Sequence, residues 1–100
     1  MSDTAATPSD AEIADRVRSA VRSVVGSELA PADDALELAP RFDAYDSLGV
    51  LDCVGAVERE FGIAVDLVDD DLRTTFVSVA AISALVRRKL DDQAVLGAAF

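Results

Sequence analysis

Ser47, in the triplet Asp46-Ser47-Leu48, is the residue of this chain whose type and position best suit chemistry. The triplet opens a stretch of helical apolar periodicity, so the serine is expected at a helix N-terminus, where free N–H groups and the dipole favour an attached anion. The chain has no histidine, which excludes a Ser-His-Asp arrangement that would activate the hydroxyl. Ser47 is therefore predicted to accept a modification from another enzyme. The structural alternative is a plain N-cap serine.

Two other features invite a chemical interpretation. Cys53 is the single cysteine, so it forms neither an internal disulfide nor a zinc site, and we expect it to pack as a small buried hydrophobe. The acidic run at 66–71 lacks the glycine and the closing glutamate of an EF-hand loop, so a solvated connector is predicted and no metal site.

Three principal helices are predicted to position Ser47. The first covers 10–25, with a capping box at Ser9 and Glu12 and a stop at Gly26. A long loop over 26–46 follows, with room for a short helical turn, and four apolar side chains are expected to hold it on the core: Leu29, Leu36, Leu38 and Phe42.

The second principal helix begins at Asp46-Ser47 and ends at Gly62. Gly49 and Gly55 weaken it by roughly 1 kcal/mol each relative to alanine, and close helix packing is the expected compensation. A short helix starts after Asp69-Asp70-Asp71, and Ser78 caps a last helix whose final turn holds Arg87, Arg88 and Lys89. The residues expected to be buried together are Val54, Val57, Phe61, Ile82 and Leu85.

These elements predict an all-α fold, a small four-helix bundle of three main helices and one short helix. One hundred residues correspond to a single domain. Residues 1–8 are expected to form a disordered tail, 9–90 the domain, and 91–100 a C-terminal tail.

The charge of the chain restricts its partners. Nineteen acidic residues against nine basic ones give a formal net charge of −10, which disfavours nucleic acid and anionic membranes. Positively charged patches on other proteins are the expected partners. The N-terminus has no secretory pattern and no apolar run is long enough to span a bilayer, so a soluble cytoplasmic protein is expected.

The chain resembles the acyl carrier protein family, which includes the related peptidyl carriers, over about residues 10–90. The resemblance is densest over 46–52 and 56–63, where Asp-Ser-Leu is followed by an apolar-acidic helix and a Glu-Arg-Glu-Phe-Gly-Ile ending. It implies a non-catalytic carrier on which Ser47 bears 4′-phosphopantetheine through a phosphodiester, with acyl or aminoacyl groups held as thioesters. A phosphopantetheinyl transferase and the enzymes that load and process the cargo are the implied partners, and a monomer is expected.

Two departures from the fatty-acid carriers favour a discrete carrier of a polyketide or non-ribosomal peptide pathway. Gly49 stands at a position that is usually acidic, and Asp43-Ala44-Tyr45 precedes the triplet in place of a Leu-Gly pattern. Partner enzymes are expected to contact a surface made of Asp46, Leu48, Val50, Asp52 and Glu58. The alternatives are a peptidyl rather than an acyl carrier, and an acidic helical adaptor without a prosthetic group.

Overall fold

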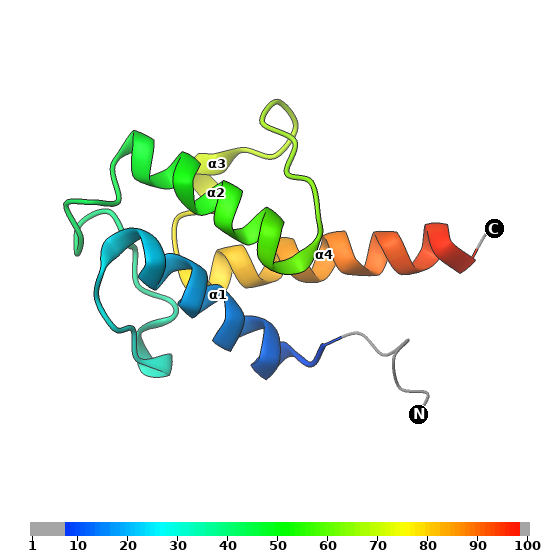
Figure 1. The fold of residues 1–100 in the computed structure, drawn as a ribbon, viewed down its shortest axis with the longest axis horizontal. Helices are drawn as coiled ribbons and strands as arrows, with labels where there is room; N and C mark the ends of the chain where they lie inside the picture. Colours follow the sequence, from blue (N-terminus) through cyan, green and yellow to red (C-terminus); the bar gives the residue numbers. More distant parts are fainter. Residues whose placement is uncertain (1–7, 99–100) are drawn as a thin grey trace.

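The computed structural model describes residues 8–98, with side chains as far as Val95. Its elements, in chain order, are α1 (Asp10–Val25), the 3₁₀ turn η2 (Pro31–Asp33), α2 (Ser47–Phe61), α3 (Leu72–Thr75) and α4 (Val79–Ala98) (Figure 1). The predicted all-α bundle of three main helices and a short one is confirmed, and residues 8–98 contain no strand. The tail expected over 1–8 lies outside the described residues except for Pro8.

Helix α1 begins and ends where its local sequence predicts. The amide of Glu12 donates to Ser9 Oγ at 3.1 Å and the Ser9 amide donates to Glu12 Oε1 at 3.2 Å, which completes the capping box. Gly26 ends the helix in the left-handed region at φ 74°, where a side chain would be strained. Gly62 ends α2 in the same way at φ 65°.

Gly49 allows the chain before α2 to pass against the first turn of that helix. A Cβ at Gly49 would overlap the carbonyl oxygen of Ala44 and would lie 3.0 Å from its carbonyl carbon. The close approach that requires glycine at position 49 therefore comes from the preceding turn and not, as predicted, from the packing of another helix. At Gly55 a Cβ would meet only the flexible end of Arg59, at 3.3 Å from Nη1, so no comparable packing requires glycine there.

The loop over 26–46 packs onto the helices through part of its apolar set. Leu38 is fully buried, and its amide donates to the carbonyl oxygen of Val77 at 2.9 Å. Leu29 and Phe42 pack against the core, and η2 supplies the short helical turn. The expectation for Leu36 is wrong: this residue is 50% exposed and is not among those packed against the core.

Helices α3 and α4 begin as predicted, but α4 does not end at its basic residues. The Asp71 carboxylate caps α3, and Ser78 Oγ accepts from the amide of Ala81 at 3.1 Å at the start of α4. The expectation of a final turn at 87–89 is wrong, since α4 continues to Ala98. Arg87 and Lys89 instead form ion pairs with Asp10 (2.9 Å) and Asp70 (2.8 Å).

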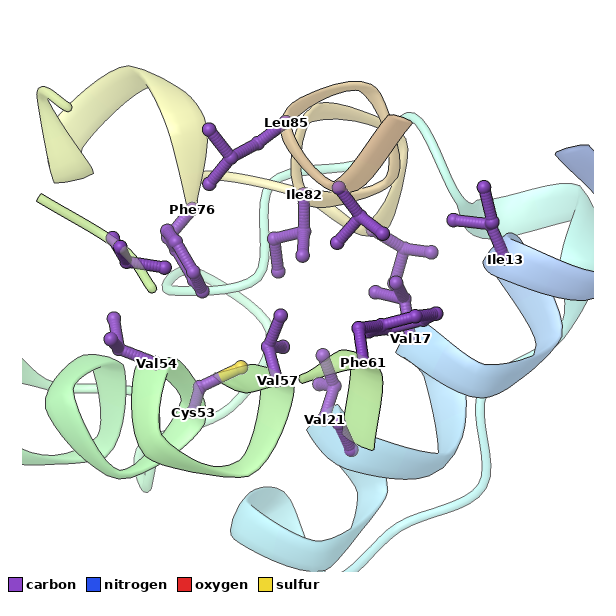
Figure 2. Packing of buried hydrophobic residues seen from close by; sticks show 14 of the residues in the cluster. Ile13, Val17, Val21, Cys53, Val54, Val57, Phe61, Phe76, Ile82 and Leu85 are labelled. Atoms are coloured by element: carbon purple, nitrogen blue, oxygen red, sulfur yellow. The ribbon is translucent and has the colours of Figure 1, made fainter. Parts of the chain in front are cut away.

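The core lies between α1, α2 and α4, with the end of α3 beside it. Figure 2 shows Ile13, Val17 and Val21 of α1 facing side chains of α2 and α4. The five residues predicted to be buried together are confirmed, namely Val54, Val57, Phe61, Ile82 and Leu85. In the part of the chain that the structure covers, none of the helices is both long enough and apolar enough to cross a membrane.

Candidate functional site

Ser47 is the first residue of α2 and its side chain is exposed. The helix is capped by its neighbour: Asp46 Oδ1 accepts from the amide of Gly49 at 2.9 Å. The N-cap role therefore belongs to Asp46, and the Ser47 hydroxyl makes no hydrogen bond to another residue of the described chain. Because this hydroxyl is exposed and neither caps the helix nor makes a hydrogen bond, it is accessible to a modifying enzyme.

A groove of about 340 Å³ runs beside this hydroxyl, between the start of α2 and α3. It is lined by Ser47, Val50, Leu51, Leu72 and Arg73. Its walls are mostly apolar aliphatic side chains, while the serine and the arginine supply the polar atoms. The groove thus suits a group that is attached to Ser47 and has an apolar portion.

Leu72 and Arg73 could not be assigned to this site from the sequence. They follow Ser47 by about 25 positions, and only the folding of α3 against the start of α2 brings them beside it. The sequence predicts a short helix at this point, but it does not predict which other helix that segment approaches.

Tyr45 connects the segment before Ser47 to the end of α3. Its buried phenol donates to the carbonyl oxygen of Phe76, the C-cap residue of α3, at 2.6 Å. Burial is the largest cause that raises the pKa of Tyr45 far above its ordinary value, and the neighbouring Cys53 adds to the rise. The phenol therefore remains protonated and keeps this hydrogen bond over the physiological pH range.

Cys53 packs in the core beside Tyr45, as predicted for a small buried hydrophobe. Burial raises the pKa of its thiol to about 11, although the hydrogen bond with Tyr45 opposes part of that rise. Since the thiolate is the reactive form of cysteine, this side chain is inert near neutral pH.

The residues predicted for partner recognition fall into two groups along α2. Leu48, at 72% exposure, projects into solvent beside Ser47, while Val50 is half-buried in the groove. Asp46 is exposed, but its carboxylate is engaged by the helix amide described above. Val50 thus lies with Ser47 along the groove, whereas Leu48 is not among the residues that line it.

Asp52 and Glu58 lie further along α2. Asp52 is exposed and lines a separate polar groove with Ser23 and Arg59. Glu58 follows Ser47 by about 16 Å along the helix axis, and its Oε2 accepts from the amide of Val65 at 2.8 Å. That bond anchors the segment after α2, so a substitution of Glu58 perturbs the fold as well as the surface charge.

The pKa values of three aspartates between α2 and α4 are lowered, and backbone amides contribute to each shift. Hydrogen bonds from the amides of Asp69 and Val68 lower the pKa of Asp66, and the amide of Arg73 lowers that of Asp71. For Asp70 the largest cause is the hydrogen bond from Lys89. The carboxylates thus shape the turn that leads into α3, the helix that forms one wall of the groove beside Ser47.

Comparison of the chain with protein-family models, with curated proteins and with solved structures gave no match. Function is therefore inferred from the residues and geometry of this chain. The arrangement offers a primary alcohol at a helix N-terminus, an apolar groove beside it, and no histidine to deprotonate the alcohol. Such a site suits covalent attachment by another enzyme.

Proposed function

We propose that this protein is a non-catalytic carrier that holds acyl or aminoacyl intermediates on a 4′-phosphopantetheine arm attached to Ser47. The observation that carries the proposal is the Ser47 hydroxyl, exposed at the start of α2, relieved of capping by Asp46 and placed beside the groove. The likeness of 46–52 and 56–63 to acyl carrier proteins supports the same function.

The residues at the start of α2 fit a phosphodiester on Ser47. The Gly49 amide already donates to Asp46, but the amides of Ser47 and Leu48 have no acceptor within the described residues, and the positive end of the dipole favours a negative group there. When bound, the arm supplies a terminal thiol that forms thioesters. The chain has no accessible thiol of its own because Cys53 is buried, and the groove walls formed by Val50, Leu51 and Leu72 provide an apolar surface along which an attached group can lie.

We further propose that the carrier serves a polyketide or non-ribosomal peptide pathway. Fatty-acid carriers usually have an acidic residue at the position of Gly49, and here a side chain at that position would overlap the Ala44 carbonyl. Partner enzymes would therefore rely more on Leu48, which is exposed beside Ser47, and on Asp52. Those partners are a phosphopantetheinyl transferase and loading and processing enzymes that carry basic patches.

The mass of the intact protein tests the proposal. The chain is coexpressed with a broad-specificity phosphopantetheinyl transferase, and we expect it to gain the mass of one arm. Ser47→Ala should fold and gain nothing. Ser9→Ala is the matched control, because Ser9 also stands at a helix N-terminus but caps it; this variant should still be modified.

The second candidate function, an acidic helical adaptor without a prosthetic group, predicts a different result. The net charge of −10 favours it equally. Wild type that gains no mass under conditions that modify a known carrier would refute the carrier and leave the adaptor. Modification of Ser47→Ala would refute the assignment of the serine.

A further inference from the structure

Arg73, on α3, lines the same groove as Ser47. Its side chain is 91% exposed, and its Nε lies 3.3 Å from Asp71 Oδ1. The same carboxylate oxygen also accepts from the amide of Arg73 at 3.0 Å. Asp71 therefore holds the inner end of the guanidinium, and the terminal nitrogens have no hydrogen-bond partner within residues 8–98.

The charges around Ser47 make this arginine distinctive. Asp46 precedes the serine, Asp52 follows on the same helix, and no basic residue occurs from 47 to 58. Arg73 is the only basic residue among those that line the groove. An anion attached to Ser47 would therefore meet carboxylates along α2 and a guanidinium across the groove.

We infer that Arg73 is a positioning residue whose guanidinium pairs with the phosphate carried by Ser47 in the modified protein. The inference rests on the proposed function. A guanidinium presents several donors in a plane, which suits phosphate oxygens. The pair draws the first part of the arm toward the groove side of α2, over Val50 and Leu72, rather than toward the polar face that holds Asp52.

The phosphorus-31 resonance of the modified protein tests this pairing directly. Four modified proteins are compared at low and high salt: wild type, Arg73→Gln, Arg73→Lys and Arg59→Gln. Arg59 is the matched control because it is an exposed arginine on α2 that lines the other, polar groove, of which Ser47 is not a lining residue. Thermal unfolding of the unmodified Arg73→Gln chain establishes that the fold is retained, as expected for a side chain that is nearly fully exposed.

An exposed ion pair is screened by salt, so we expect the wild-type resonance to move between low and high salt. Arg73→Gln should lose most of that movement and resemble wild type at high salt. Arg73→Lys should keep part of it, because the charge remains without the planar donors, and Arg59→Gln should behave as wild type.

The two levels of the proposal fail in different ways. If wild type gains no arm, the proposed function fails and this inference fails with it. If the arm is attached but the resonance responds to salt equally in wild type and Arg73→Gln, only the pairing is overturned. In that case Arg73 would be free to pair with a carboxylate of the cargo instead of the phosphate.

Discussion

Adding one methyl group at each of two glycines of α2 should change stability in opposite directions. In Gly49→Ala the new Cβ would overlap the carbonyl oxygen of Ala44, which is backbone and cannot turn aside. In Gly55→Ala the new Cβ would meet only Arg59 Nη1, at 3.3 Å, and that side chain can move. The two substitutions are chemically identical and lie in the same helix.

The expected magnitudes follow from these contacts. Overpacking costs about 1–3 kcal/mol, and displacing the first turn also weakens the cap from Asp46 to the Gly49 amide, worth about 1 kcal/mol. Alanine recovers about 1 kcal/mol of helix propensity. Gly49→Ala should therefore lower the free energy of unfolding by about 2 kcal/mol, whereas Gly55→Ala should raise it by about 0.5–1 kcal/mol.

Urea and thermal unfolding followed by far-ultraviolet circular dichroism measure both effects. For a domain of this size, a change of 1 kcal/mol shifts the midpoint temperature by about 4–8 °C, so the two variants should differ by more than about 10 °C. Gly49→Ala unfolding at or above the wild-type midpoint would show that the Ala44 carbonyl does not approach α2 as described.

Four further perturbations test other parts of the structure. Phe61→Ala should lower the free energy of unfolding by roughly 3–5 kcal/mol, since the ring is buried between α1 and α4; an unchanged urea midpoint would contradict the assigned face of α2. Tyr45→Phe should lower it by about 1–3 kcal/mol, because the Phe76 carbonyl loses its buried donor; a variant as stable as wild type would refute that hydrogen bond. The Cys53 thiol has a pKa near 9.0 when unfolded and about 11 when folded, so the contribution of the protonated thiol to stability is complete below pH 9 and is lost as the pH rises through 11. Urea denaturation at a series of pH values should show that Cys53→Ala loses less stability from pH 8 to 10 than wild type does; an equal loss would count against the burial of the thiol. Asp52→Lys should slow modification of Ser47 at low salt and less at high salt, with Asp92→Lys on α4 as the charge-matched control; equal rates for the two variants at every salt concentration would remove Asp52 from the docking surface.

Much of the fold follows from local signals in the sequence. Three helix starts offer a side-chain acceptor in the sequence, and the structure uses each as a cap: Ser9 with Glu12, the aspartate before Leu72, and Ser78. The end of α4 was not predictable in this way. Basic residues near a helix end complement its dipole, but Arg87 and Lys89 are equally suited to ion pairs with Asp10 and Asp70, which are distant in the sequence.

The candidate site likewise contains a residue that the sequence predicts and others that only the fold brings to it. Ser47 was identifiable because its neighbours in the sequence define the helix that presents it. Its relief from capping depends on the Asp46 carboxylate reaching the Gly49 amide, and the second wall of the groove comes from Leu72 and Arg73. The cap is a local signal of the same kind as those above, whereas the second wall depends on the path of the backbone between α2 and α3, on which local patterns carry no information.

The contact between Tyr45 and Phe76 gives the unlabelled protein an optical reporter. The chain contains a single tyrosine and no tryptophan, so the phenol signals in its near-ultraviolet absorption, emission and circular dichroism arise from Tyr45. That ring lies two positions before Ser47 and is bonded to the end of α3. Opening of the α3 wall should therefore change the tyrosine spectrum even while the far-ultraviolet signal of the three long helices stays constant. Movements at the groove can be followed in real time, during attachment or loading, without introducing a dye.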